Sequence, residues 1–356
     1  MKPSVKPVPA FTSLRGLAAI WVVAYHFRES LAGSLPRLAF SLLGEGFLAV
    51  DLFFILSGFV ITLNYRWMLE DLTLGTAKLF IVARLARIYP VHLFMCLLFL
   101  INPVCILLFS TARDLGARYD PGYYLLSLLL MQNWGLASQL EWNNPAWSIS
   151  TEWFVYLMFP ALLLGLKRLP NTVPTIAGAI IVVLAALALL FDRAGLASIG
   201  DAIPQFGLAR CLCEFLVGMG LCRLTRLVAA PGTLLTLGLL GLAGALVVAT
   251  IGFALPDFIL LPGACALVIT ALASERSPLG GWLARKPLLW LGEISYALYM
   301  THYFVKDWIK FAGLALPGPA IFLLYLSLVL LAGLAVYYGI EKPGRQYFRS
   351  IALKNV

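Results

Sequence analysis

Ten stretches of about twenty apolar residues recur along the chain, and this pattern limits its fold more than any other feature. A helix of about 20 apolar residues crosses the hydrocarbon core of a bilayer. Only 12% of the 356 residues are charged, whereas soluble domains carry roughly a quarter. We therefore predict an all-α integral membrane protein, a single domain over 1–356 built as a bundle of about ten transmembrane helices. The predicted spans are 11–29, 45–64, 84–109, 147–166, 173–191, 205–224, 232–253, 257–273, 289–310 and 318–340.

The distribution of lysine and arginine predicts how these helices are oriented. The segment 121–134 is apolar but short, which favours a re-entrant or interfacial element over a span. If 121–134 does not cross the membrane, 18 of the 26 basic residues fall on the same side of the membrane as the N-terminus. Seven fall on the other side, and Arg210 lies within a span. Positive residues accumulate in cytoplasmic loops. We therefore expect both termini to be cytoplasmic, with short tails at 1–10 and 341–356.

Several classes of protein are disfavoured by the same sequence. The net charge of +9 comes from basic residues scattered between apolar runs, whereas nucleic-acid binders gather them on one face. The six cysteines form no CxxC pair and have no histidine at zinc spacing, so we expect no metal site. The first apolar run has no signal-peptidase pattern, and we expect it to remain as a helix.

Polar side chains inside the predicted spans are the first candidates for function, because ionisable groups are costly in a bilayer. Arg15 and His26 are eleven residues apart. At 100° per residue they share one helix face, about 16 Å apart along the axis. The alternative is that Arg15 is a membrane anchor and His26 an interfacial residue.

Two carboxylates are predicted at the same outer depth as His26. Asp51 lies early in the second span, and Glu152 lies about one turn into the fourth, on one face with Ser148 and Thr151. A carboxylate beside an imidazole fixes its tautomer and stabilises its charged form, as a general base requires. A structural ion pair with an arginine is the alternative for Asp51.

A second polar group is predicted at inner depth. Arg84 and Arg87 have the i, i+3 spacing of a one-faced phosphate clamp, although such a pair also serves as an ordinary positive-inside anchor. Glu341 ends the last span on the same side. Within the sixth span, Arg210 and Glu214 are expected to neutralise each other. An inner arginine set and an outer acid–base set favour an anionic donor that binds from the cytoplasm.

Six segments, in this order, resemble acyltransferase family 3, the multi-spanning membrane acyltransferases. The resemblance covers nearly the whole chain and departs from the family at Ala49 and Thr301, where glycine and an aromatic residue are usual. The segments are Arg15 with His26, VDLFFILSGF at 50–59, RLARIYP at 84–90, PAWS at 145–148 with Glu152, ISYALY at 294–299 with His302, and EKP at 341–343.

The resemblance implies O-acylation, most often O-acetylation, of a carbohydrate or glycoconjugate of the cell envelope, with acyl-CoA as the cytoplasmic donor. Arg84 and Arg87 are then expected to bind the donor phosphates, with Arg15 and Glu341 lining the approach. His26 is expected to act as general base, with an acyl-histidine as the alternative, and Asp51 or Glu152 to support it. Trp147, Ser148 and His302 are expected beside the acceptor; Trp147 is equally explicable as a membrane-interface anchor.

The resemblance also bears on partners and location. Some family members carry a fused outer hydrolase-like domain, and we expect none here, so a separate partner is an alternative route for the final transfer. The expected location is the bacterial inner membrane. The rival hypothesis is a transporter or flippase of an acylated or anionic glycan. The sequence shows no pair of interrupted spans in its two halves, which weighs against a transporter.

Overall fold

The computed structural model describes residues 8–70, 72–109, 115, 118–253, 255–273 and 279–354, and all regular structure in these ranges is helical. The long helices are α1 (Pro9–Phe27), α3 (Ala49–Tyr65), α4 (Leu74–Phe99), α7 (Trp147–Arg168), α8 (Val173–Arg193), α9 (Ile203–Leu224), α10 (Thr233–Phe253), α11 (Asp257–Leu272), α13 (Lys286–Ala312) and α14 (Gly318–Val336). The shorter helices are α2 (Arg37–Gly44), α5 (Ile101–Phe109), α6 (Pro121–Leu128), α12 (Gly280–Leu283) and α15 (Lys342–Lys354).

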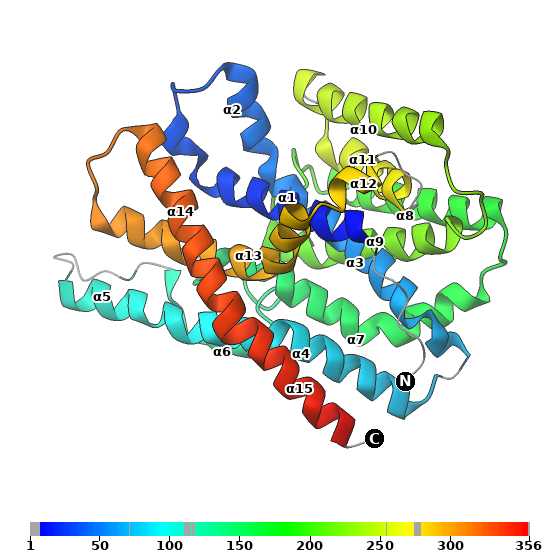
Figure 1. The fold of residues 1–356 in the computed structure, drawn as a ribbon, viewed down its shortest axis with the longest axis horizontal. Helices are drawn as coiled ribbons and strands as arrows, with labels where there is room; N and C mark the ends of the chain where they lie inside the picture. Colours follow the sequence, from blue (N-terminus) through cyan, green and yellow to red (C-terminus); the bar gives the residue numbers. More distant parts are fainter. Residues whose placement is uncertain are drawn as a thin grey trace.

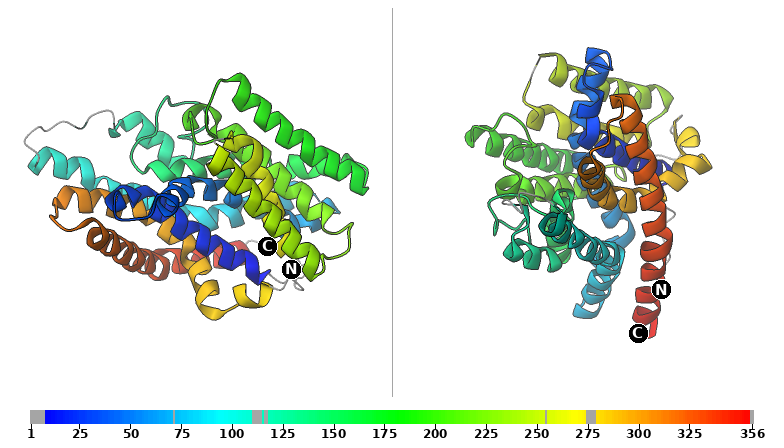
Figure 2. Two further views of the ribbon diagram at one scale, coloured as in Figure 1. Left: turned by 90° about the horizontal axis from the view of Figure 1, so that it is seen from above. Right: turned by 90° about the vertical axis from the view of Figure 1, so that its left-hand side faces the viewer.

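Helices α1, α3 and α13 lie in the middle of the bundle (Figure 1). Helices α8, α10 and α11 flank them on one side, and α4, α6 and the α14–α15 run flank them on the other, an arrangement that further views also show (Figure 2). The most extensive contacts join α1 to α13 and α3 to α9. The central helices carry four of the polar residues singled out from the sequence, which are Arg15, His26, Asp51 and His302.

Within the described ranges, seven helical segments are long and apolar enough to cross a membrane. These findings support the prediction of an all-α, multi-pass membrane protein. Three helices that match predicted spans fall outside the seven: α11, which has 16 residues, and the more polar α1 and α13. The count of ten and the cytoplasmic location of both termini remain predictions.

Two other expectations concern segments outside the bundle. The segment 121–134 contains only the eight-residue α6, whose length of about 12 Å is too short to span. The predicted C-terminal tail is helical: a π-helix, η6 (Tyr337–Glu341), joins α14 directly to α15. Of the predicted N-terminal tail, 1–7 lie outside the described residues, and α1 begins at Pro9.

Local sequence signals explain where several helices start. Thr73 and Thr76 form a capping box that starts α4 ten residues earlier than predicted from hydropathy. The Asp120 carboxylate accepts a hydrogen bond from the Tyr123 amide at the start of α6 (2.6 Å), and Thr172 caps α8 in the same way. These caps satisfy amide groups that the helix itself leaves unpaired.

The crossing of α1 and α13 is set by two glycines. A Cβ atom on Gly16 would lie 2.7 Å from the Gly292 amide nitrogen, and a Cβ on Gly292 would collide with the carbonyl oxygen of Thr12. Small residues at such a crossing let two backbones approach closely. The same relation holds between Gly58 on α3 and the backbone of Phe215 on α9.

We predict that Gly292→Ala destabilises the protein by about 1–3 kcal/mol, because the added methyl group overfills a packed crossing. Gly241→Ala on α10 is the matched control, since its Cβ meets open space. Thermal unfolding of the purified protein in detergent measures both. A melting temperature for Gly292→Ala equal to that of the control would contradict the proposed close crossing.

Candidate functional site

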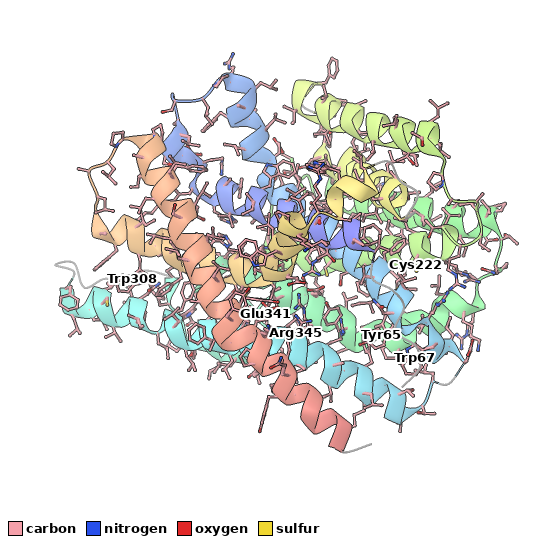
Figure 3. The ribbon with its side chains drawn as sticks, in the orientation of Figure 1. Tyr65, Trp67, Cys222, Trp308, Glu341 and Arg345 are labelled. Atoms are coloured by element: carbon pink, nitrogen blue, oxygen red, sulfur yellow. The ribbon has the colours of Figure 1, made fainter. Side chains whose placement is uncertain are left out.

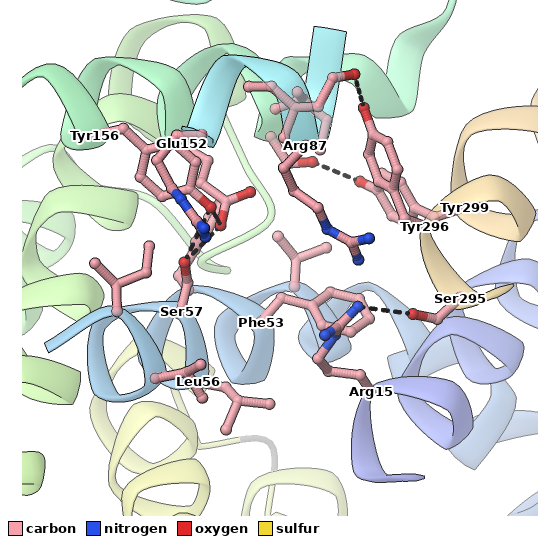
Figure 4. Close-up of a pocket in the computed structure, with 18 residues that line it drawn as sticks. Arg15, Phe53, Leu56, Ser57, Arg87, Glu152, Tyr156, Ser295, Tyr296 and Tyr299 are labelled. Carbon is pink, nitrogen blue, oxygen red and sulfur yellow. Dashed lines mark hydrogen bonds between the residues drawn. The ribbon is translucent and has the colours of Figure 1, made fainter. Parts of the chain in front are cut away.

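A cavity of about 170 Å³, here called the arginine cavity, lies between α1, α3, α4, α7 and α13. Three arginines from separate parts of the sequence, Arg15, Arg84 and Arg87, line it (Figure 4). The guanidinium groups of Arg15 and Arg87 point toward one another across it. The cavity also contains polar groups from α3, α7 and α13, which are Ser57, Ser148, Glu152, Tyr156, Ser295, Tyr296 and Tyr299.

The arginines of this cavity are only partly neutralised. Arg15 Nη2 donates to Ser295 Oγ (3.3 Å), and Arg84 Nη2 donates to Tyr65 Oη (3.0 Å). Arg84 Nε is buried and, among the described residues, has no hydrogen-bond partner. An unpaired charged donor in a cavity is costly unless a ligand satisfies it. Together these groups form a site with excess positive charge that is suited to an anion.

Glu341 provides the charge partner of Arg87. Arg87 Nη1 contacts Glu341 Oε1 at 2.6 Å, and Arg345 Nη1 reaches the same oxygen at 3.5 Å. Figure 3 shows Glu341 and Arg345 where α14 passes into α15. Glu341 is buried and its Oε2 has no partner in the described chain. The structure thus brings the four residues predicted for donor binding to one region of the protein.

Glu152 lies in the arginine cavity with two hydroxyl groups. Its Oε1 accepts hydrogen bonds from Ser57 Oγ (2.6 Å) and Tyr156 Oη (2.5 Å). The dashed lines on the left of Figure 4 trace this cluster. The structure therefore does not place Glu152 beside His26. The Glu152 carboxylate faces the arginine cavity instead.

His26 lines a second cavity of about 290 Å³, here called the histidine cavity. Tyr25, Asn144, Trp147, Asp201 and Arg210 line it as well. Aromatic faces beside amide, carboxylate and guanidinium groups form a surface suited to a polar ligand with apolar faces. Trp147, predicted beside the acceptor, and His26, predicted as the base, thus line one cavity. Ser148, also predicted beside the acceptor, lines the arginine cavity instead.

His26 and His302 form a hydrogen-bonded pair at the edge of this cavity. His302 Nδ1 contacts the Tyr299 carbonyl oxygen (2.5 Å), and His26 Nδ1 contacts the Val22 carbonyl oxygen (3.0 Å). Carbonyl oxygens only accept, so both rings carry their proton on Nδ1. His26 Nδ1 also lies 3.3 Å from His302 Nε2, so the one proton on His26 Nδ1 is shared between the Val22 carbonyl oxygen and this second acceptor.

This arrangement leaves Nε2 of His26 unprotonated and without a protein partner among the described residues. His302, held through its Nδ1 by the Tyr299 carbonyl, accepts at its Nε2 from the Nδ1 side of the His26 ring. An imidazole ring that is held through Nδ1 in this way is oriented to take a proton at Nε2. The partner that the structure places beside His26 is therefore a histidine rather than either predicted carboxylate.

Asp51 is paired with Arg210 across α3 and α9. Arg210 Nε and Nη2 donate to the two carboxylate oxygens of Asp51 at 2.9 and 2.5 Å, and both side chains are buried. Glu214, the partner expected for Arg210, lies farther away at 3.9 Å. Arg210 also lies over the Trp147 ring at 5.7 Å. The arginine pair considered as the alternative for Asp51 is thus the contact observed.

Sequence reasoning singled out most of the charged groups of both cavities but missed neutral ones. Ser57, Tyr156 and Tyr299 were not predicted as site residues, although each contacts one that was. Tyr156 could have been found from its i+4 spacing to Glu152, which places the two side chains on one helix face. Tyr299 donates to the Pro145 carbonyl and lies 2.8 Å from Ser148 Oγ, a contact between distant segments.

Comparison with known proteins identifies the family to which this chain belongs. The profile of a family described as "Acyltransferase domain" matches residues 8–338. The chain belongs to acyltransferase family 3. The residues that line the two cavities all fall within the part of the chain that matches this acyltransferase family, which supports an enzyme. No solved structure matches the chain.

Individual relatives support the same assignment. The chain is 32% identical over 327 residues to Acyltransferase MdmB of Streptomyces mycarofaciens, covering 86% of this chain and 80% of that protein. It is 25% identical over 328 residues to O-acetyltransferase OatA of Staphylococcus aureus, covering 84% of this chain and 51% of OatA. The chain thus aligns with about half the length of OatA. These family 3 relatives are named for acyl and O-acetyl transfer.

We predict that Asp51→Ala lowers the free energy of unfolding by about 3–5 kcal/mol, because it leaves the buried guanidinium of Arg210 without its main partner. The double variant Asp51→Leu/Arg210→Met removes both charges and recovers most of that loss. Thermal unfolding in detergent compares the three proteins. Wild-type stability in the single variant would show that the pair has no structural role.

Proposed function

We propose that this protein is a membrane O-acyltransferase that moves an acyl group, with acetyl as the simplest case, from acyl-CoA to a hydroxyl of a carbohydrate or glycoconjugate. Its proposed location is the bacterial inner membrane and its product a modified polysaccharide or other envelope glycan. The observation that carries the proposal is the adjacency of a cation-lined cavity and a cavity with an available imidazole nitrogen. Two bacterial relatives named for acyl and O-acetyl transfer support it.

The arginine cavity is the proposed site of the donor. Phosphate groups accept forked hydrogen bonds from guanidinium groups more readily than from any other side chain. Arg84 has an unpaired Nε, and Arg15 has a neutral partner, so both are available to an anion. Arg87 forms an ion pair with Glu341. The Glu341 carboxylate compensates the charge of Arg87 when no donor is bound.

The histidine cavity is the proposed site of the acceptor. Nε2 of His26 takes the proton of the acceptor hydroxyl, and the oxygen attacks the thioester carbonyl carbon. The new C–O bond forms, the C–S bond breaks, and the proton passes from His26 to the CoA thiolate. His302 accepts from Nδ1 of His26 and so stabilises the imidazolium between these steps. Trp147 offers an aromatic face to a sugar ring.

His26→Ala is expected to reduce acyl transfer by about 10²–10⁴-fold, the usual contribution of a positioned general base. His92→Gln is the control, since His92 contacts neither cavity. Inverted membrane vesicles from expressing cells are supplied with radiolabelled acetyl-CoA, and label in the glycan fraction is counted. Normal incorporation by a folded His26→Ala protein would contradict the role of His26, and glycan movement without label incorporation would favour a transporter.

Arg84→Ala is expected to weaken CoA binding roughly ten- to hundredfold, the range for loss of a charge-assisted hydrogen bond. Arg37→Ala removes the same charge from an exposed position on α2 and serves as control. Isothermal titration of the purified protein with CoA measures both affinities. Equal affinities in the two variants would exclude Arg84 from the donor site.

A further inference from the structure

The arginine and histidine cavities share two lining residues, Val50 of α3 and Tyr299 of α13. Each of these side chains therefore faces one cavity on one side and the second cavity on the other. Both are buried within the protein. The two cavities therefore adjoin at these two residues, here called the shared wall.

The Tyr299 ring is held in place from several directions. Its hydroxyl donates to the Pro145 carbonyl oxygen (2.9 Å) and lies 2.8 Å from Ser148 Oγ. The Phe53 ring packs edge-on against it at 6.1 Å. The Tyr299 carbonyl oxygen accepts from His302 Nδ1. Tyr299 thus borders both cavities and also orients the histidine pair.

Val50 is held through its neighbour in the sequence. Asp51 is fixed by two hydrogen bonds to Arg210, so the backbone of α3 at this turn has little freedom. Val50 itself is β-branched, and such side chains have one strongly preferred rotamer in a helix. The position of the Val50 side chain between the cavities is therefore well defined.

We propose that Val50 and Tyr299 form the passage through which the acyl group is transferred, and that their size limits the length of the acyl chain. This inference rests on the proposed function. The donor phosphates bind in one cavity and the hydroxyl proton is taken in the other, so the thioester carbonyl must reach the shared wall. The atoms of the acyl chain beyond that carbonyl then lie against Val50 and Tyr299.

The physical consequence is selectivity for short chains. A close-packed wall has no room for additional methylene groups, and one methylene in such a pocket changes discrimination by about 10- to 200-fold. A narrow passage also restricts the access of water from the histidine cavity to the thioester, which limits hydrolysis. Chain length is thus set by the two wall residues and not by the arginines that bind the phosphates.

The test uses two substitutions at Val50 that act in opposite directions. Val50→Ala widens the passage, and Val50→Ile narrows it. Val329→Ala is the matched control, because Val329 is a buried valine of α14 that lines neither cavity. Inverted membrane vesicles carrying the full chain receive radiolabelled acetyl-CoA or butyryl-CoA, and label in the glycan fraction is measured for each donor.

The quantity compared is the ratio of butyryl to acetyl incorporation. Val50→Ala is expected to raise this ratio at least about tenfold, and Val50→Ile to lower it, relative to wild type and Val329→Ala. An unchanged ratio in both Val50 variants, with incorporation retained, would overturn the inference but leave the proposed function intact. If Val50→Ala does not fold, Val50→Ile decides alone. No incorporation by wild type from either donor would instead overturn the proposed function.

Discussion

The contact between α1 and α13 is the interaction on which both cavities depend. Its close approach at Gly16 and Gly292 brings Arg15 within reach of Ser295 near one end of the pair. Farther along the same two helices, His26 meets His302. One helix crossing therefore sets the position of an arginine proposed to bind the donor and of the proposed base. A change that separates the two backbones would alter both ends of the site together.

Charged side chains of two physical classes lie in and around the two cavities. Asp51 and Arg210 satisfy each other with two hydrogen bonds, as a pair within a low-dielectric interior must. Arg84 and Glu341, in contrast, each retain an atom without a partner in the described chain. The first class holds helices together. Side chains of the second class have hydrogen-bonding atoms without a protein partner, as a site for an ionic ligand requires.

Much of this organisation could be predicted from the sequence, and the rest follows from packing that the sequence does not reveal locally. Apolar runs located the helices, and motif spacing located Arg15, His26 and Glu152. The partners of these residues lie far along the chain: Ser57 bonds Glu152 from 95 residues away, and His302 meets His26 from 276 residues away. Shared depth suggested that His26 and the carboxylates would meet, but depth does not specify which helix faces which. The partners of His26 and Glu152 depend on the rotation of each helix about its own axis.

The π-helix η6 determines where Glu341 points. It lies between α14 and α15, and such segments often occur at functional sites. Each residue added to a helix turns everything beyond it by about 100°. A deletion of one residue within 337–341 would therefore preserve the hydropathy of the last span but rotate Glu341 away from Arg87. The length of this segment thus constrains the site independently of its hydropathy.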